Sequence, residues 1–326
     1  MKRSTFTRAL AASAVLAGGA PLAWAQTAAP RWPTRPLRLL VGFPAGSTPD
    51  NSARALADGL ASALGQPVIV ENRAGASGNI AADLVAKAGD DHTLGVVING
   101  NLTSAKMLNP ALPYDPARDF SLLSLLTTAP LALVAPADLP AGAAFFQAAG
   151  QAGDRWNYGS VGVGSVAHLG MELLKSKVPG LKPVHVPFQG NPAVVTGLLG
   201  GQVQMALMPP GLVLQHVKAG KLRIIGLTGG RSTLAPEVPP LAEAGVRDFN
   251  LEVWTALVGP AGLSKAAQQR LAAEVPKVVR SPEVRQRLFV QGWNAVGSSP
   301  EGLRQRVGTE AASMRAIIQA AGVKVE

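Results

Sequence analysis

The chain has 326 residues, with 30 Lys and Arg against 20 Asp and Glu, and it contains no cysteine. Without cysteine there are no disulfides, so packed cores must stabilise the fold. The basic residues are scattered without a run and aromatic residues are few, which argues against nucleic-acid binding. The four histidines show no pair at ligand spacing, so we expect no metal site, and we expect no cofactor.

The first 25 residues have the pattern of an export signal. Three basic residues precede an apolar stretch from Ala9 to Leu22, and the small-x-small pattern of Ala23 to Ala25 follows it. This apolar stretch is too short for a membrane span. We therefore expect a signal peptide at residues 1–25 and a periplasmic mature protein. Its formal charge falls from +10 to +7, because three basic residues and no acidic one are removed.

The elements that follow alternate between strand and helix. Continuous apolar runs predict strands, whereas apolar residues that recur at helical spacing predict helices. Such alternation is typical of an α/β fold with a mostly parallel sheet. In chain order, the first half predicts strands at 37–43, 68–70, 93–98 and 131–135, helices at 49–64 and 78–88, and a proline-rich break at 109–116.

The second half of the chain repeats this alternation. Val166, Leu169 and Leu173 form a helical stripe, and Asn191 is the predicted N-cap of a further helix. The other predicted elements are strands at 203–207, 222–227 and 254–258 and helices at 212–219, 264–280 and 300–320. A mature chain of roughly 300 residues is too long for one ordinary core, so we expect two domains.

Two Gly/Ser-rich turns each follow an apolar strand and open an apolar-faced helix. They span Pro44 to Asp50 and Gly159 to Ser165, and neither contains Lys or Arg. A strand-to-helix turn of this kind points free backbone amides at one spot, where the helix dipole favours negative charge. The pair of turns therefore predicts a cleft that grips a small anion from both sides by neutral donors.

A series of ordered motifs gives the chain a resemblance to a known family. The motifs occupy residues 32–38, 42–54, 71–82, 112–120, 157–175, 185–193, 198–203, 220–223 and 241–245. With them, the chain resembles the solute-binding receptors of the tripartite tricarboxylate transporter family, often called Bug proteins. The resemblance covers nearly the whole mature sequence. It implies an α/β, two-lobed periplasmic-binding-protein fold of type II, a Venus flytrap with two crossovers between the lobes.

The resemblance also implies where the lobes lie and what they bind. Lobe one would comprise residues 27–127 plus 251–326, and lobe two residues 128–250. The lobes would close on a small organic acid, held by backbone amides, hydroxyls and ordered waters of the two glycine turns. The implied protein partners are the integral-membrane permease subunits of a tripartite tricarboxylate transporter, and we expect the receptor to be a monomer.

Several candidate ligand-binding residues also have a structural explanation. Asp50 can contact the ligand or stabilise its helix, Ser47 can donate to the ligand or cap the helix, and His168 can donate to an anion or fill the core. Three glycines within six residues of the second turn make sense where something must approach the backbone closely. The predicted ligand-binding residues are Pro44, Ala45, Gly46, Ser47, Asp50, Ala76, Ser77, Ser160, Gly162, Gly164, Ser165 and His168.

Three positions depart from the family pattern. Ser47 stands where the family usually has the second glycine of a Gly-Gly pair, and a left-handed conformation there would be strained although a hydroxyl donor is gained. Gly197 and Gln204 stand where the family usually has Asp. These departures predict a ligand preference that differs from that of well-matched relatives.

Two other functions stay open. An orphan receptor of this kind would signal to a periplasmic sensor protein rather than serve a transporter. An exported α/β enzyme has weaker support, because the Gly162-x-Gly164-x-x-Ala167 pattern lacks the acidic residue expected about twenty positions further on. No serine has glycines at both flanking positions of a hydrolase elbow either. We therefore expect a binding protein and not an enzyme.

Overall fold

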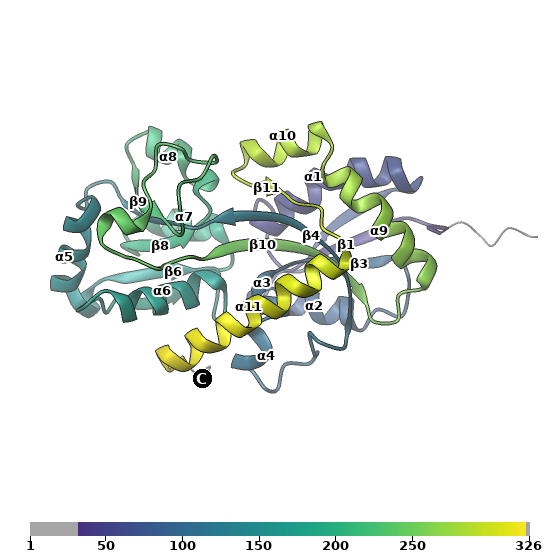
Figure 1. Cartoon of the computed structure of the whole chain (residues 1–326), viewed down its shortest axis with the longest axis horizontal. Coiled ribbons are helices and arrows are strands. Elements are labelled where there is room, and N and C mark those ends of the chain that lie inside the picture. Colours follow the sequence, from purple (N-terminus) through teal and green to yellow (C-terminus); the bar gives the residue numbers. More distant parts are fainter. Residues whose placement is uncertain (1–31, 324–326) are drawn as a thin grey trace, which may run out of the picture. The chain divides into compact units, whose positions relative to one another are not determined.

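Two β-sheets organise the chain in the computed structural model, which describes residues 32–323 (Figure 1). Helices flank both sheets, which confirms the predicted α/β class. The expectation of a mostly parallel sheet is wrong, because both sheets also contain antiparallel strand pairs. The predicted signal peptide at residues 1–25 lies outside the described residues. Within the described range, no helix combines the length and apolar character that crossing a membrane requires.

The first sheet combines parallel and antiparallel strands. Its strands are β1 (Leu37–Val41), β2 (Val68–Asn72), β3 (Thr93–Ile98), β4 (Phe120–Pro130), β10 (Glu252–Pro260) and β11 (Asn294–Ala295), in the order β11-β4-β10-β3-β1-β2. β1 pairs in parallel with β2 and β3, whereas β10 runs antiparallel to β3 and β4. The helices that belong to this part of the chain are α1 (Thr48–Leu64), α2 (Asn79–Ala86), α3 (Asn99–Leu102), α4 (Ala105–Leu108), α9 (Lys265–Val279), α10 (Pro282–Val290) and α11 (Pro300–Ala321).

The second sheet is built from the middle of the chain. Its strands are β5 (Ala132–Pro136), β6 (Asn157–Ser160), β7 (Val184–Pro187), β8 (Met205–Met208) and β9 (Leu222–Leu227), in the order β7-β6-β8-β5-β9. β6 is parallel to β7 and β8, and β5 is antiparallel to β8 and β9. The helices between these strands are α5 (Gly142–Ala152), α6 (Val166–Lys177), α7 (Asn191–Leu199) and α8 (Leu214–Lys218).

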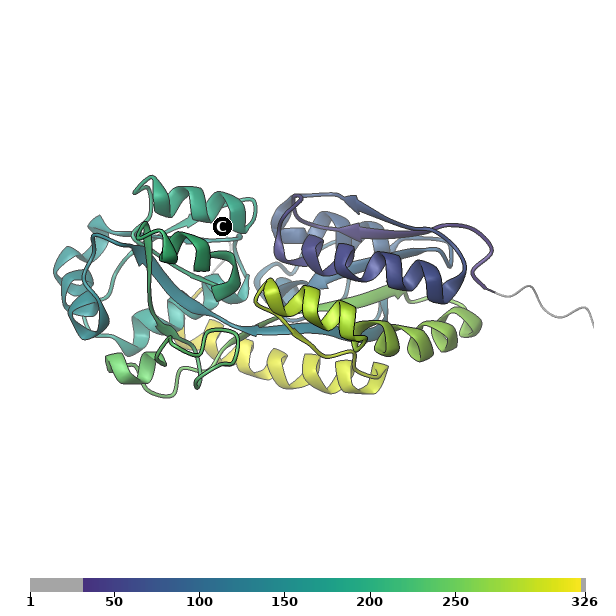
Figure 2. The same cartoon turned by 90° about the horizontal axis from the view of Figure 1, so that it is seen from above.

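The chain passes between the two sheets twice. β4 of the first sheet continues through Leu131 into β5 of the second, and the return runs through residues 228–251 between β9 and β10 (Figures 1 and 2). Helix α11, yellow in Figure 2, packs against both β4 and α6. The two passages of the chain, from β4 to β5 and from β9 to β10, are the two crossovers expected for the two-lobed fold.

Helix boundaries follow the capping signals of the sequence. α1 carries Pro49 in its first turn and ends at Gly65, whose φ of 74° is left-handed. α9, α10 and α11 begin at Ser264, Ser281 and Ser299, each of which accepts a hydrogen bond from the backbone amide three residues on. The apolar stripe of α1 is buried in the core, as its spacing predicts: Ala53, Leu56, Leu60 and Leu64.

Among the elements missing from the sequence-based prediction are β4, α5 and α10. β4 lies inside the sheet between β10 and β11 and is largely buried, so it lacks the alternation that marks a half-exposed strand. α5 is rich in Ala and Gly and begins at Gly142, whose φ is 56°. α10 begins only three residues after α9 ends, and Pro282 at its first position separates the two.

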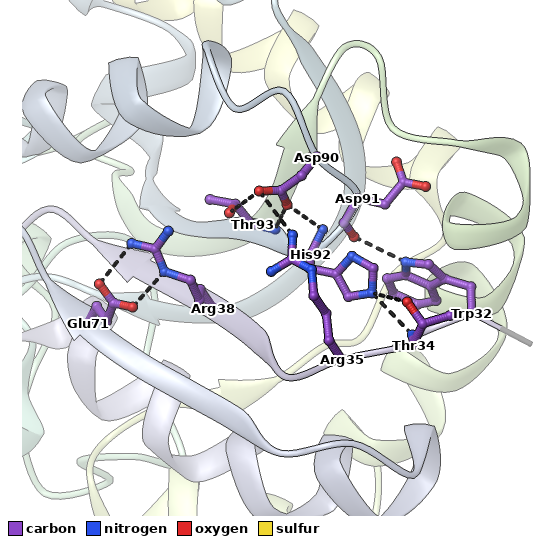
Figure 3. Close-up of polar contacts among 9 residues, drawn as sticks. All are labelled: Trp32, Thr34, Arg35, Arg38, Glu71, Asp90, Asp91, His92 and Thr93. Atoms are coloured by element: carbon purple, nitrogen blue, oxygen red, sulfur yellow. Dashed lines mark hydrogen bonds and ion pairs between the residues drawn. The ribbon is translucent and has the colours of Figure 1, made fainter.

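Polar contacts fix the amino-terminal end of the first sheet (Figure 3). Asp90 accepts the backbone amide of His92 at 2.6 Å, and His92 Nε2 accepts the amide of Thr34 at 3.1 Å. Arg38 Nε and Nη2 donate to the two carboxylate oxygens of Glu71 at 2.6 and 3.0 Å, which joins β1 to β2. This pairing with Arg38 lowers the pKa of Glu71 to about 2. The opposite, carboxyl end of the parallel strands is left for a binding site.

A buried carboxylate lies beside the crossover strand β10. Glu310 of α11 accepts hydrogen bonds from Asn99 Nδ2 at 2.7 Å and from Trp254 Nε1 at 2.5 Å, and Arg306 Nη2 lies 3.4 Å from it. Burial raises the pKa of Glu310 and outweighs these three contacts, which act in the lowering direction. The charged form of Glu310 therefore opposes folding.

Replacing Glu310 with Gln should change stability, relative to wild type, in a direction that becomes more favourable as pH rises. Because the folded-state pKa lies above the unfolded value, the wild type is favoured below the unfolded pKa and loses stability as pH rises through the folded pKa. Glutamine does not titrate. We expect the free energy of unfolding of E310Q, relative to wild type, to increase between about pH 4 and pH 8 in urea denaturation. The exposed E283Q control should show no trend, and a relative stability that falls with pH would contradict this account.

Candidate functional site

A cavity of about 380 Å³ lies where the carboxyl ends of strands from both sheets meet. The first sheet contributes the turns after β1 and β2 together with α4, and the second contributes the turns after β6 and β7. Ligands of open α/β sheets bind at this end of the strands. The lining residues are Gly42, Phe43, Pro44, Ala74, Gly75, Ala76, Ser77, Gly78, Asn79, Ala105, Leu108, Asn109, Val161, Gly162, Val163, Pro187, Phe188 and Gln189.

None of the residues that line this cavity in the described part of the chain carries a formal charge. Polar side chains come from Ser77, Asn79, Asn109 and Gln189. The lack of Lys and Arg agrees with the expectation of neutral donors. An anion in such a cavity would be held by peptide dipoles, as in sites formed by successive backbone amides. Across residues 32–323, no cluster of His, Asp or Glu is placed to hold a metal ion.

Two amides of the first glycine turn have acceptors within the turn. Gly46 N donates to Asp50 Oδ2 at 2.9 Å, and Ser47 N donates to the carbonyl oxygen of Pro44 at 3.1 Å. Asp50 is buried and is also held by Arg54 and Asn72. Burial alone would raise the pKa of Asp50, but the bonds from Arg54, Asn72 and Gly46 prevail and lower it. Asp50 is therefore a brace within the turn and lies outside the lining of the cavity.

The predicted strain at Ser47 is absent. Its φ of −72° and ψ of 163° are those of an ordinary extended N-cap, and Gly46 carries the left-handed φ of 77° instead. The Ser47 hydroxyl is buried and has no hydrogen-bond partner within residues 32–323. It lines a small cavity of about 30 Å³ together with Thr48, Ser165 and Asn191, among other residues. That volume is sufficient to hold a water molecule.

The second glycine turn also uses its amides internally. Gly162 N donates to Ser160 Oγ at 3.1 Å, Gly164 N to His168 Nδ1 at 3.2 Å and Ser165 N to the carbonyl oxygen of Gly162 at 3.2 Å. Ser165 caps α6 by accepting the amide of His168 at 3.2 Å. In the structure, hydrogen bonds to backbone groups in and next to the turn are made by Ser160, Ser165 and His168.

Other amides that border the cavity are unused, and one of them lies within the second turn. The backbone NH groups of Ala76, Ser77 and Val163 have no acceptor in the described part of the chain. Ala76 and Ser77 have φ values of 47° and 55°, and Gly78 follows with 88°, so three consecutive residues are left-handed. For residues other than glycine this conformation costs of order 1–3 kcal/mol each and clusters at functional sites. Such a run points successive NH groups toward one side and forms a nest for an anion.

Residues from the two sheets come very close across the cavity. Ser104 Oγ donates to the carbonyl oxygen of Gly164 at 2.6 Å. A Cβ at Gly162 would lie 2.0 Å from Ser77 Oγ, and a Cβ at Gly164 would lie 2.9 Å from Leu108 Cδ1. Both glycines also have positive φ values, 123° and 79°. Glycine is therefore required at these positions, as the sequence analysis argues from close approach.

The twelve predicted site residues fall into groups. Four of them line the large cavity: Pro44, Ala76, Ser77 and Gly162. Ser47 and Ser165 line the small one. The others shape the two turns without lining either cavity: Ala45, Gly46, Asp50, Ser160, Gly164 and His168.

Sequence reasoning missed most of the lining that comes from neighbouring strand ends. Phe188 and Gln189 follow β7, and Asn79 opens α2 beside the left-handed turn. Leu108 and Asn109 come from α4, an element that the sequence analysis does not predict. Lining residues can be predicted from their position directly after β2 and β7, because the carboxyl ends of parallel strands share one edge of a sheet.

Comparisons with known proteins give four related findings. The family model of the tripartite tricarboxylate transporter family receptor matches residues 52–323. Protein BugT of Bordetella pertussis is 32% identical over 98% of this chain and 99% of its own length. An R. palustris protein determined with adipate is 29% identical with a TM-score of 0.85, covering 90% of this chain and 99% of that one. MatC from Rhodopseudomonas palustris, with bound malate, is 31% identical with a TM-score of 0.82, covering 88% and 100%.

The two sheets, the two crossovers and the cavity between the strand ends define a two-lobed periplasmic binding protein. Within that class, the chain belongs to the tripartite tricarboxylate transporter receptor family. The resemblance drawn from the sequence motifs is confirmed. The protein is a solute-binding receptor, and the family and its structural neighbours are binding receptors.

Removing the carboxylate of Asp50 should destabilise the protein through the first turn. Asp50→Ala leaves Gly46 N without its acceptor, and we expect the free energy of unfolding to fall by about 1–3 kcal/mol in urea denaturation. Asp50→Asn should cost less because its amide oxygen still accepts. Asp58→Ala, on the same helix with a side chain 87% exposed, is the matched control. Equal effects at the two positions would show that Asp50 does not brace the turn.

Proposed function

We propose that the cavity binds one small organic acid and holds its carboxylate at the left-handed turn from Gly75 to Gly78. The observation that carries this proposal is the set of unused amides at Ala76, Ser77 and Val163, which border a cavity without formal charge. Adipate and malate, the ligands named for the two R. palustris structures, are acids of this class. Ordered water can bridge a carboxylate to these amides at little cost relative to direct bonds.

The apolar part of the ligand would contact the apolar residues that line the rest of the cavity. Phe43 and Leu108 come from the first sheet and Phe188 from the second, so an acid with an apolar body finds contacts on both sides. Pro44 and Gly162 border the same space. The other predicted site residues would act by holding the turns in shape: Ala45, Gly46, Ser47, Asp50, Ser160, Gly164, Ser165 and His168.

Ligand binding would work by hinge closure of two lobes. We assign residues 27–127 plus 251–326 to lobe one and 128–250 to lobe two, so that the hinge lies in the two crossover segments. Two hydrogen bonds join the sides in the closed form: Ser104 to Gly164 at 2.6 Å and Asn191 Nδ2 to Thr48 Oγ1 at 2.8 Å. A ligand that contacts both sides binds the closed form more tightly and shifts the population toward it.

The closed receptor would then be recognised by a membrane partner. Membership of this receptor family implies a transporter, and we infer that the integral-membrane permease subunits bind the closed form. Residues 1–25 would direct export to the periplasm, where the receptor works as a monomer and leaves its ligand chemically unchanged.

A thermal-shift screen of carboxylates tests the proposed ligand class. We expect at least one acid from a panel that includes malate, adipate, tricarboxylates and aromatic acids to stabilise the protein. At about one hundred times its Kd, a ligand stabilises by about 2.7 kcal/mol. Chromatography should recover the acid unchanged. Stabilisation by none of the acids, or conversion of one of them, would contradict the proposal.

Substitution of a turn glycine tests the location of the site. Gly164→Val should abolish binding of the acid found in the screen while the far-UV spectrum stays that of the wild type. The physical reason is the φ of 79° and the approach of Leu108 to 2.9 Å from a Cβ at this position. Gly262→Val, in an exposed turn with open space around its Cβ position, is the control. Unchanged affinity in Gly164→Val, measured by calorimetry, would remove the second turn from the site.

A further inference from the structure

Two histidine rings stack behind the second glycine turn. The ring centroids of His168 and His185 are 4.2 Å apart at an interplanar angle of 28°. Tyr158 stacks on His185 with a centroid distance of 4.9 Å and on His168 with 6.4 Å. His168 is only 6% exposed, and Tyr158 is fully buried. The three rings come from β6, α6 and β7, so they join the elements on either side of the turn.

Each histidine holds one glycine of the turn. His168 Nδ1 accepts the backbone amide of Gly164 at 3.2 Å, which it can do only while that nitrogen carries no proton. His185 Nε2 lies 2.7 Å from Ser160 Oγ, and Ser160 Oγ accepts the amide of Gly162 at 3.1 Å. The first contact is direct and the second runs through a hydroxyl. The conformation of the turn therefore depends on the protonation state of the rings.

The charged groups around the rings are few. On α6 itself, Glu172 accepts the hydroxyl of Tyr158 at 2.5 Å and pairs with Lys175 at 2.9 Å. β8, which packs against α6, carries only Met, Ala and Leu.

Two further elements on this side of the molecule carry charge. On α11, which packs against α6, Arg306 and Glu310 lie 3.4 Å from each other. On α4, whose Leu108 approaches Gly164, Lys106 donates to the carbonyl oxygens of Pro110 and Leu112.

Burial makes protonation of both rings unfavourable. It is the largest cause that lowers the pKa of His168 and that lowers the pKa of His185 to about 4. His168 lowers the pKa of His185 further, because two imidazolium rings in contact repel each other. Glu172 acts in the opposite direction on both. The hydrogen bond from Gly164 N to His168 Nδ1 is therefore intact at neutral pH. It is lost when acid protonates that nitrogen.

We propose that His168 is a positioning residue for the second glycine turn. In its neutral form, His168 holds the amide of Gly164. When the stacked histidine pair takes up a proton, His168 releases the turn and with it the bound acid. On protonation, Nδ1 of His168 becomes a donor and faces the NH of Gly164, another donor, in a buried setting. The turn must then move, and the contact of Gly164 with Ser104 of the opposite sheet moves with it. The consequence for the ligand rests on the proposed function, whereas the release of the turn does not.

Amide hydrogen exchange of Gly164 in the ligand-free protein tests this inference. In the wild type, we expect the protection factor of this amide to fall at least tenfold from about pH 7 toward about pH 4. The amides of Leu39 and Val41 in β1 report global unfolding and should stay protected over the same range.

Three variants separate positioning from mere packing. In His168→Asn, the side-chain oxygen replaces Nδ1 as acceptor and does not titrate, so Gly164 should stay protected across the whole range. In His168→Leu, protection should be lost at every pH, and His216→Asn on α8 should behave as the wild type. Loss of protection in acid that is equal in wild type and His168→Asn, or no loss in wild type, would overturn the inference.

Binding of malate, measured by calorimetry across the same pH range, gives the functional arm. We expect its affinity to fall at least tenfold in acid for the wild type and to change less for His168→Asn. An affinity that falls equally in both variants would overturn the link between the turn and release. If malate does not bind at any pH, the choice of ligand is wrong, and the exchange of Gly164 alone decides the inference about the turn.

Discussion

The distribution of hydrogen-bond acceptors among backbone amides determines the character of this binding site. The amides of Gly46, Gly162 and Gly164 have partners inside their own turns, so these turns are rigid supports. In the left-handed run from Ala76 to Gly78, the amides of Ala76 and Ser77 are unused beside the cavity, whereas Gly78 N donates to the carbonyl oxygen of Gly75. A hydrogen bond stabilises this strained conformation, because Asn101 Nδ2 donates to the carbonyl oxygen of Ser77 at 3.1 Å.

Both sheets contribute to the cavity. The first sheet supplies the amides of Ala76 and Ser77, and the second brings Val163 and Gly162 against them. Neutral contacts such as Asn191 to Thr48 join the two sides, so the proposed closure requires no desolvation of an ion pair at this contact. A site of this kind suits reversible capture, because only a ligand that bridges both sides adds to the stability of the closed form.

Much of the fold could be predicted from the sequence, because strand and helix alternation, the N-caps and the glycine turns are local signals. The embedded strand β4 could not, because a strand buried on both faces lacks alternation. The sequence locates the two turns, and the structure adds that the amides of Gly46, Gly162 and Gly164 have acceptors nearby in the chain. The acceptors Asp50 and His168 each lie four residues after the glycine that they bind, and that spacing was the overlooked signal. The left-handed run at Ala76 depends on tertiary support, which no local pattern reveals.

The most direct test of the central claim is a crystal structure of the mature protein with the acid that stabilises it most. The account predicts a carboxylate within hydrogen-bond distance of the amides of Ala76 and Ser77, directly or through one water molecule, with no Lys or Arg in contact with it. A carboxylate clamped by a Lys or Arg side chain, or a ligand bound away from this cavity, would contradict the account.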